Sequence, residues 1–460
     1  MTDLQSRTDV LSQLTAELGD VISTDPAELD AARADKSGHV APGTPLAIVH
    51  ATEIAHVQAA LRIASATGTP VVTRGAGTGL AGAANAGEGE LVISTARMTR
   101  IIEVLADDEL AVVEPGIINA DLNAALADKG LWWAPDPASR AIATVGGNIA
   151  TNAGGLLCVK YGVTREAVLG LKVVLADGRL MEFGHRTIKG VTGFDLTALM
   201  IGSEGLLGVI VEATLRLRRV DPNPISTIGA YFPTVEQAAR AAAVISSSGL
   251  RPAIMEVLDK PSMEGIAAYL GLDVREQSYL LVQTDGTAAP AEAEAALGII
   301  RSLGGEAELS TSPEEGERLL RIRRSFHPAM EARGTVLIED VCVPRSALPA
   351  MFAAIEQIGE RFGIQIPTVA HAGDGNLHPN FVFTPDPTQE GGVPAHVWEA
   401  ADEMFLTAVR LGGTLTGEHG IGLLKKRWLV NELGQDQFDL QQQIKAVFDP
   451  QGILNPGKVY

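Results

Sequence analysis

The amino-acid sequence predicts an α+β protein built from more than one domain. The chain has 460 residues, of which 46% are hydrophobic, so it is long enough to form roughly three units with buried cores. Asp177-Gly178 lies between two apolar runs and is typical of a tight β-hairpin, which favours antiparallel pairing over a purely parallel sheet. Beyond residue 224, strand and helix patterns alternate as in a layered α+β domain.

The first 44 residues are predicted to form a helical lead-in, because Val10, Leu14 and Leu18 recur at helical spacing. A first domain is expected over residues 45–220. It opens with a strand at 46–50, followed by a helix that Thr52 would cap and that ends near Gly68. Its other strands are predicted from short aliphatic runs between turn residues. They are 70–73, 91–94, 101–105, 111–113, 171–176, 179–183 and 208–217.

A linker is predicted at Asp221-Pro222-Asn223-Pro224, because two prolines so close together interrupt both helix and sheet. A second domain is expected over residues 221–410, and its strands and helices alternate. The strands are 228–232, 254–258 and 279–284, and the helices are 235–247, 263–270 and 291–303. Residues 411–460 are too few for a separate core, so we expect this C-terminal segment to pack back on the preceding domains.

The composition excludes several classes of protein. There are 36 Lys and Arg against 56 Asp and Glu, and the resulting net charge of −20 opposes binding to nucleic acid or to an anionic membrane. Two cysteines are too few for a disulfide framework and fit a reducing compartment. The sequence has neither a secretory leader pattern nor an uncharged apolar run of about 18 residues, so we expect a cytoplasmic protein without an integral membrane segment.

A glycine-rich loop follows the predicted strand at 70–73. Gly77-x-Gly79-x-x-Gly82 matches the dinucleotide-binding fingerprint as text. A Rossmann crossover needs at least about 10 residues, mostly helical, before the next parallel strand. Residues 83–90 supply only eight, two of them glycines, so the Rossmann interpretation fails. The loop is either a turn without a ligand or a set of backbone amides, beside Arg74, that can hold a pyrophosphate.

Two further glycine clusters favour the second interpretation. Residues 146–155 combine glycines with Asn and Thr side chains that can bind a cofactor, and residues 202–208 lead directly into the last strand of the domain. Three such loops in one domain predict a large, phosphate-bearing cofactor.

Together with Pro135-Asp136-Pro137-Ala138-Ser139, Lys160-Tyr161-Gly162 and Thr192-Gly193-Phe194-Asp195-Leu196, these loops resemble those of the vanillyl-alcohol-oxidase-type (p-cresol methylhydroxylase) flavoproteins. The branch they resemble holds glycolate oxidase large subunits, D-lactate dehydrogenases and D-2-hydroxyglutarate dehydrogenases. The resemblance implies an FAD-binding domain of two α+β subdomains and a ferredoxin-like α+β cap domain. FAD is expected to be non-covalent, because the first loop contains no histidine. The implied FAD-binding residues are Arg74, Gly75, Ala76, Gly77, Thr78, Gly79, Pro137, Ser139, Thr144, Gly146, Gly147, Thr151, Asn152, Gly154, Gly155, Tyr161, Gly162, Glu204, Gly205, Gly208, Ile210 and Asn455.

Two motifs are candidates for a metal site. His371 and His378 are seven residues apart across a turn-rich segment, and Glu418 precedes His419. Two imidazoles and a carboxylate suit a divalent ion such as Zn²⁺, although they can also be ordinary polar loop residues. The resemblance implies a metal on His371, His378 and Glu418, with Zn²⁺ favoured over Mn²⁺ and Fe²⁺, and His419 as the catalytic base. Asp374 remains a rival oxygen ligand.

A run of arginines at 321–324 is either a solvated basic face or the source of a substrate anchor, because a guanidinium pairs with a carboxylate in bidentate fashion. The resemblance implies that Arg323 is the catalytic anchor. His327, four residues later, would lie on the same helix face, and Asn380 would also contact substrate. Relatives that act on a dicarboxylate have a Lys where Ile338 stands, which favours a small monocarboxylate.

The resemblance therefore implies FAD- and metal-dependent oxidation of a small D-2-hydroxy acid, glycolate or D-lactate, to the 2-oxo acid. Alternatives are a D-2-hydroxyglutarate dehydrogenase, a metal-independent flavin oxidase of another alcohol, and a non-catalytic flavin-binding subunit. No iron–sulfur, haem or NAD motif is present in the sequence. Electrons are therefore expected to pass to an external quinone, electron-transfer protein, partner subunit or oxygen, and such a partner could hold the protein peripherally at a membrane.

Overall fold

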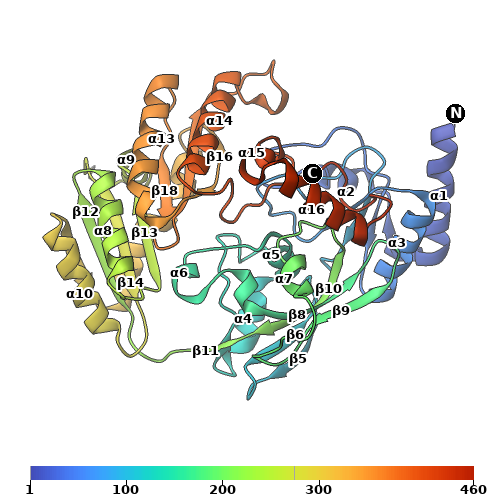
Figure 1. The fold of residues 1–460 in the computed structure, drawn as a ribbon, viewed down its shortest axis with the longest axis horizontal. Helices are drawn as coiled ribbons and strands as arrows, with labels where there is room; N and C mark the ends of the chain where they lie inside the picture. The colour runs from blue at the N-terminus through green and yellow to red at the C-terminus, as the bar shows by residue number, and fades with distance from the viewer. Residues whose placement is uncertain (1, 274) are drawn as a thin grey trace. The chain divides into compact units, whose positions relative to one another are not determined.

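The computed structural model describes residues 2–273 and 275–460, which fold into two compact units (Figure 1). Unit 1 comprises the chain up to residue 154, residues 162–220 and residues 418–460. Unit 2 comprises residues 155–161 and 221–417, so one boundary falls at the predicted proline linker. The units differ from the predicted ranges in two places. The 155–161 stretch lies with unit 2, where Lys160 donates a 2.9 Å hydrogen bond to the Asp285 carbonyl, and the C-terminal segment divides after Gly417.

Unit 1 contains two main sheets. One has four strands in the order β1-β2-β4-β3, and the other has five in the order β5-β6-β10-β8-β9. Its helices are α1 (Thr2–Leu18), α2 (Pro26–Ala31), α3 (Ile54–Thr67), α4 (Asn119–Ala127), α5 (Val145–Thr151), α7 (Leu196–Met200), α15 (Leu429–Leu433) and α16 (Gln435–Phe448). Its strands are β1 (Ile22–Ser23), β2 (Ala47–His50), β3 (Val71–Arg74), β4 (Leu91–Ser94), β5 (Ile101–Leu105), β6 (Leu110–Val113), β7 (Leu131–Trp132), β8 (Val168–Val174), β9 (Leu180–Gly184), β10 (Val209–Arg216) and β11 (Arg218–Arg219).

The N-terminal helix α1 packs on α3, and its predicted apolar face is buried with the four-stranded sheet. Helix α3 ends at Gly68, which adopts a left-handed φ of 66° as a terminating glycine should. The predicted cap is wrong by one residue. Glu53 occupies the N-cap position without a side-chain bond, because the Thr52 hydroxyl pairs instead with His56 at 3.3 Å.

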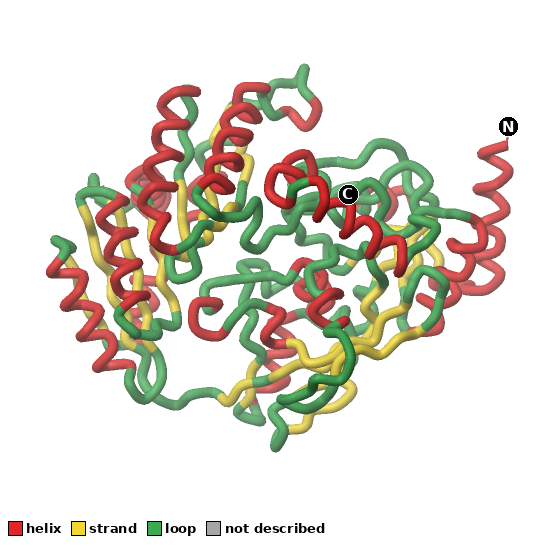
Figure 2. The backbone as a smooth tube through the Cα atoms, viewed as in Figure 1, coloured by secondary structure: helices red, strands yellow, loops and turns green. Residues whose placement is uncertain are grey.

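The strand pairing in unit 1 confirms the mixed sheets expected from the sequence. Strands β2, β3 and β4 are parallel, whereas all pairs of the five-stranded sheet are antiparallel. The hairpin predicted at Asp177-Gly178 joins β8 to β9, and Gly178 has the positive φ of 83° that this turn needs. Residues 75–90, all of which the structure describes, form a loop without a helix between parallel strands, so this is not a Rossmann unit (Figure 2).

Unit 2 is built on an eight-stranded antiparallel sheet in the order β15-β12-β14-β13-β18-β19-β16, with β17 also paired to β19. Its strands are β12 (Ser226–Phe232), β13 (Ile254–Leu258), β14 (Ser278–Thr284), β15 (Glu306–Ser310), β16 (Thr335–Ile338), β17 (Val341–Cys342), β18 (Thr368–His371) and β19 (Asn376–Phe383). Its helices are α6 (Cys158–Tyr161), α8 (Val235–Ser247), α9 (Lys260–Leu270), α10 (Ala289–Ser302), α11 (Pro313–Arg324), α12 (Phe326–Glu331), α13 (Leu348–Phe362) and α14 (Ala395–Arg410).

Helices cover the central strands of this sheet on both faces. Figure 1 shows α8 and α10 running side by side along β12 and β14, and both helices contact these strands. On the other face, Leu258 and Tyr279 are buried with Leu319 of α11. Strand β14 is therefore buried at nearly every position and lacks an alternating pattern. Within the described part of the chain, no helix combines the length and the apolar character needed to cross a membrane.

Substitutions at two glycines, one inside α10 and one just after it, test this packing. Gly298 lies exposed in the helix interior, where an added Cβ would meet nothing within 4 Å. Gly298→Ala should raise stability by about 0.5–1 kcal/mol, because Gly loses more backbone entropy on folding than Ala. The matched control is Gly305→Ala, whose Cβ would lie 2.6 Å from the Phe232 ring. Thermal unfolding should give a higher Tm for the first variant and a lower Tm for the second; the reverse order would contradict this arrangement.

Candidate functional site

The three glycine-rich loops of unit 1 lie against one another. An added Cβ on Gly75 in the first loop would lie 2.3 Å from the Thr144 hydroxyl, which caps α5 in the second. In the third loop, the Gly202 amide donates a 2.9 Å hydrogen bond to the Ile149 carbonyl of α5. The sequence predicted the loops separately, and the fold brings them together.

Polar atoms at the meeting point of these loops fit a polar cofactor. The Thr73 hydroxyl and the Asn455 side-chain carbonyl are buried, and neither has a hydrogen-bond partner among the described residues. The Asn455 amide donates to the carbonyls of Glu204 at 2.7 Å and Ala83 at 3.0 Å, which fixes the side chain between two loops. Asn455 reaches this place because its segment pairs with Val71 of β3. Buried acceptors and donors normally find partners, so these atoms suit a bound group with many polar atoms, such as FAD.

Arg74 was expected to face a pyrophosphate, but its observed partners are in the protein. Its guanidinium donates to the carbonyls of Ala34 at 2.7 Å and Ala84 at 2.8 Å, and thereby ties the first glycine loop to the chain after α2. An added Cβ on Gly77 would lie 2.2 Å from this guanidinium, which explains the glycine. Phosphate binding by Arg74 stays a prediction. The same holds for Tyr161, whose hydroxyl bonds the Asp285 carboxylate at 2.5 Å.

Glu204, expected to contact the cofactor, holds the turn that follows His419. Its buried carboxylate accepts hydrogen bonds from the amides of Ile421 at 2.8 Å and Gly422 at 2.9 Å. Burial raises the pKa of Glu204 to about 7 despite these bonds. Its backbone adopts a left-handed φ of 49°, a strained conformation for a residue with a side chain. An added Cβ on Gly420 would lie 2.9 Å from the carboxyl carbon, so the turn is closely fitted to Glu204.

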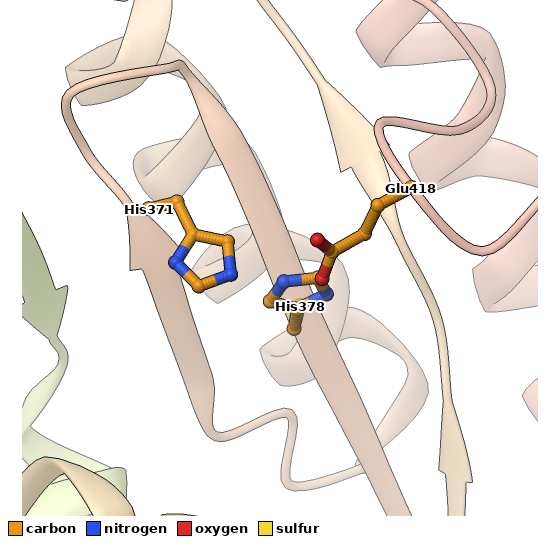
Figure 3. A group of neighbouring side chains, drawn as sticks. All are labelled: His371, His378 and Glu418. Carbon is orange, nitrogen blue, oxygen red and sulfur yellow. The ribbon is translucent and has the colours of Figure 1, made fainter. Parts of the chain in front are cut away.

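The two candidate histidine ligands lie on one β-hairpin of unit 2. In the register of β18 and β19, His378 is opposite Val369 and His371 is opposite Asn376. Because Val369 and His371 are two residues apart, the two imidazoles lie diagonally on the same face of the sheet. Their ring centroids are 5.0 Å apart, and Figure 3 shows the rings next to each other. The seven-residue spacing thus reflects a tight hairpin.

Glu418 completes the group. The Asp340 carboxylate accepts hydrogen bonds from the Thr416 hydroxyl at 2.5 Å and the Gly417 amide at 2.9 Å, which fixes the turn just before Glu418. One ligand atom from each of His371, His378 and Glu418 lies within 4.8 Å of the others, and Figure 3 shows the carboxylate directed at the imidazoles. The group does not include Asp374. Two imidazole nitrogens and a carboxylate oxygen fit Zn²⁺, Mn²⁺ or Fe²⁺ with positions left open, while the metal itself stays a prediction.

Glu418 also lies against the second glycine loop. An added Cβ on Gly154 would be 2.3 Å from a Glu418 carboxylate oxygen. The glycine expected to approach a cofactor is therefore also needed to leave room for the Glu418 side chain. His419, the expected base, follows directly in the sequence and is half-buried.

Two buried carboxylates near the histidines were missed by the sequence analysis. Glu256 lies on β13 directly opposite His371, and its carboxylate accepts from His371 Nδ1 at 2.7 Å. Asp340 lies 3.9 Å from His378 Nδ1. Metal-binding histidines commonly present their second nitrogen to a carboxylate, as His371 does to Glu256. The sequence did contain a signal: Glu256 interrupts an otherwise apolar predicted strand, and a charge at a buried position requires a partner.

Arg323 and His327 were both expected to bind substrate, but one is mostly buried and the other is exposed. Arg323 is mostly buried and donates through Nε to Glu256 at 2.6 Å. The expectation that His327 points the same way is wrong, because α11 ends at Arg324 and a new helix begins at Phe326. Pro328 has no N–H to continue the first helix. His327 is instead exposed and pairs with Glu331 at 3.2 Å, so its role in substrate binding has no geometric support.

Asn380 lies two residues beyond His378 on β19, and therefore on the same face. Its amide donates to the His378 carbonyl at 2.9 Å. Its side-chain carbonyl is buried and has no hydrogen-bond partner in the described part of the protein. The position is consistent with the expected contact to substrate, which remains a prediction.

Two protein-family models together match most of the chain. A family model described as "FAD linked oxidases, C-terminal domain" matches residues 221–459, and one described as "FAD binding domain" matches residues 45–184. The chain belongs to the FAD-linked oxidases. This membership confirms the oxidoreductase class and the FAD-binding domain expected from the glycine-rich loops.

Curated relatives of this FAD-linked oxidase cover most of its length. It is 38% identical to glycolate oxidase subunit GlcD of Bacillus subtilis, over 90% of this chain and 89% of the relative. It is 36% identical to D-lactate dehydrogenase of Archaeoglobus fulgidus, over 90% of both chains. It is 34% identical to D-2-hydroxyglutarate dehydrogenase of Xanthomonas citri, over 95% of this chain and 94% of the relative.

Solved structures share the fold. p-Cresol methylhydroxylase with bound substrate superposes with a TM-score of 0.79 at 17% identity, covering 99% of this chain and 97% of that one. Alkyldihydroxyacetonephosphate synthase gives a TM-score of 0.74 at 19% identity, over 98% and 85%. At such low identity these likenesses concern the fold alone, and they confirm the predicted fold class.

The raised pKa of Glu204 predicts a pH-dependent stability. Its ordinary pKa is 4.5 and its folded value is about 7, so the folded state favours the neutral form. The stabilisation from this group is complete below pH 4.5 and is lost as the pH rises through about 7. The loss is at most roughly 3 kcal/mol. Urea unfolding from pH 4.5 to pH 8 should show a smaller fall in stability for Glu204→Gln than for the wild type. An equal fall in both proteins would contradict the assignment.

Proposed function

We propose that this FAD-linked oxidase converts a small D-2-hydroxy acid, glycolate or D-lactate, into its 2-oxo acid, with non-covalent FAD and a divalent metal, Zn²⁺ before Mn²⁺ or Fe²⁺. The observation that most supports this is the group formed by His371, His378 and Glu418, whose ligand atoms lie within 4.8 Å of one another. A 2-hydroxy acid offers one carboxylate oxygen and one hydroxyl oxygen, which match the open positions of such a site. The names of the relatives point to the same class of substrate.

In this proposal each protein residue has a defined task. Arg323 binds the substrate carboxylate through the two Nη groups that Glu256 leaves available. His371, His378 and Glu418 hold the ion, which when bound would lower the pKa of the substrate hydroxyl. His419 accepts the hydroxyl proton, which an imidazole with an ordinary pKa of about 6.5 can do near neutral pH. Glu204 supports His419 by fixing the turn that follows it.

When bound, FAD would supply the oxidising chemistry, because a flavin can take up the C2 hydrogen of a substrate with two electrons as a hydride. The substrate would leave as the 2-oxo acid, with its hydroxyl proton held by His419. The electrons leave for an external acceptor, namely a quinone, an electron-transfer protein, a partner subunit or oxygen. A partner subunit is supported by the Bacillus subtilis relative, which is named as a subunit of glycolate oxidase. The expected cytoplasmic location, with or without attachment to a membrane through this acceptor, stays a prediction.

The surroundings of Asn380 favour a monocarboxylate. Ile338 on β16 is directly opposite Asn380 in the sheet register, and the buried acids Glu339 and Asp340 follow it. An aliphatic side chain beside two carboxyl groups offers no cation for a second substrate carboxylate. This arrangement argues against D-2-hydroxyglutarate, although one relative is named for that substrate.

Anaerobic mixing with 2-hydroxy acids tests the proposal. The flavin band at about 450 nm should bleach with glycolate or D-lactate and far more slowly with L-lactate or D-2-hydroxyglutarate, because hydride transfer reduces the flavin. Treatment with a chelator should abolish the bleaching, and added Zn²⁺ or Mn²⁺ should restore it. Full bleaching in chelator would replace the proposal with a metal-independent flavin oxidase. A colourless protein, or flavin that no hydroxy acid bleaches, would indicate a non-catalytic subunit.

Replacement of the proposed base gives a second test. His419→Ala should slow the bleaching roughly a hundred- to ten-thousand-fold, the usual contribution of a general base, while the FAD content stays unchanged. The matched control is His396→Ala, which removes an exposed imidazole from α14 and should bleach at the wild-type rate. Stopped-flow absorbance and the flavin-to-protein ratio measure both effects. Rapid bleaching by His419→Ala would remove His419 from the mechanism.

A further inference from the structure

One carboxylate in unit 2 serves two functional side chains at once. Glu256 has no exposed surface, and its two oxygens are used separately. Oε1 accepts from His371 Nδ1 at 2.7 Å, and Oε2 accepts from Arg323 Nε at 2.6 Å. The first partner is an expected metal ligand and the second is the expected substrate anchor.

The backbone fixes this triangle. Glu256 on β13 is directly opposite His371 on β18, so their side chains leave the sheet on the same face. Ile254 and Leu258, two residues away on either side, lie on that face as well and are buried with the residues of α11. Arg323 is in the last turn of α11. Sheet register and helix packing therefore bring the three side chains together without any long loop.

The chemistry of the carboxylate sets the state of His371. An ionised carboxylate can only accept hydrogen bonds, so Nδ1 must be the protonated nitrogen and Nε2 presents its lone pair. Both Glu256 oxygens act as acceptors, one from the Arg323 guanidinium and one from His371 Nδ1, so the tautomer suited to metal binding is the one that Glu256 stabilises.

The same carboxylate also orients the guanidinium. Because Nε faces Glu256, the edge formed by the two Nη groups is the part of Arg323 left for a substrate carboxylate. Among the described residues, Glu256 is the one acceptor for this side chain, which is only 14% exposed. Loss of the Glu256 charge would therefore release a guanidinium and an imidazole together.

We propose that Glu256 is a positioning residue that fixes both the metal-binding nitrogen of His371 and the carboxylate-binding edge of Arg323. The inference rests on the proposed function, because it takes the His371 group as a metal site and Arg323 as a substrate anchor. It adds that these two sites share one support, so that a change at Glu256 weakens both. The competing explanation is a purely structural ion pair that stabilises unit 2.

Two binding titrations on the FAD-loaded full chain test the inference without turnover. The first titrates Zn²⁺ into metal-free protein, and the second titrates oxalate, an inert anion with carboxylate and chelating oxygens, into zinc-saturated protein. Glu256→Gln keeps the volume but removes the charge and one acceptor. It should weaken zinc binding roughly 10- to 100-fold, the usual effect of losing a carboxylate behind a metal-binding histidine, and should weaken oxalate binding by a similar factor. If this variant does not fold, Glu256→Asp should shift both constants in the same direction.

A neighbouring carboxylate gives the matched control. Asp259 follows directly after β13 as the N-cap of α9 and is also buried. Its carboxylate accepts from the Ser262 amide at 2.9 Å and from the Thr368 amide at 2.8 Å, and neither residue belongs to the proposed sites. Asp259→Asn should lower the Tm but change each binding constant less than twofold. Arg323→Met should weaken oxalate binding and leave zinc binding intact. Glu256→Gln added to Arg323→Met should then cause little further loss of oxalate affinity, because the double variant has no guanidinium for residue 256 to orient.

Three results would overturn the inference. The first is a Glu256→Gln variant that binds zinc as tightly as the wild type. The second is a Glu256→Gln variant that loses zinc binding but keeps the wild-type affinity for oxalate. This result would show that Glu256 does not position both sites. The third is an equal loss of zinc and oxalate affinity in Asp259→Asn, which would make the effect a consequence of stability. A wild type that binds zinc and oxalate but oxidises no hydroxy acid would contradict the proposed function and leave this inference standing.

Discussion

A carboxylate buried in a β-sheet must be paired, and this constraint organises the candidate site of unit 2. Taking an isolated charge out of water costs far more than a folded protein can offset, so a buried acid is stable only where hydrogen-bond donors surround it. Glu256 meets the constraint through His371 and Arg323. Asp340 meets it through Thr416, Gly417 and Asn376, and so fixes the turn that presents Glu418. The side chains proposed to bind metal and substrate are thus held in place because two buried carboxylates, Glu256 and Asp340, need hydrogen-bond donors.

In unit 1, the candidate cofactor site is shaped mainly by the close approach of backbone segments at glycines. Where Gly75 meets Thr144 and Gly154 meets Glu418, there is no room for a Cβ. The loops can therefore approach one another closely, and they leave the buried polar atoms of Thr73 and Asn455 for a bound group. Glu204 contributes in a different way, because its side chain supports the turn after His419 while its strained backbone belongs to the third loop.

Much of this arrangement could be predicted from the sequence. The turn at Asp177-Gly178, the proline linker at 221–224 and most strands follow from local chemistry and apolar periodicity. The residues proposed to bind the metal, His371, His378 and Glu418, were predicted from residue type and family resemblance, and the structure brings them together. Glu256 was missed because its role depends on the register between β13 and β18, and no local pattern specifies which strands pair. His327 was misplaced because helical spacing was extended past the break at Ser325, which Pro328 imposes.

The proposed chemistry requires that His371, His378 and Glu418 hold one divalent ion. Anomalous diffraction at the zinc edge, from crystals grown with Zn²⁺ and a 2-hydroxy acid, tests it most directly. We expect a single strong peak at about 2.0–2.2 Å from His371 Nε2, from one His378 nitrogen and from one Glu418 oxygen. A peak coordinated by other residues, or a map without anomalous density at these three side chains, would contradict it.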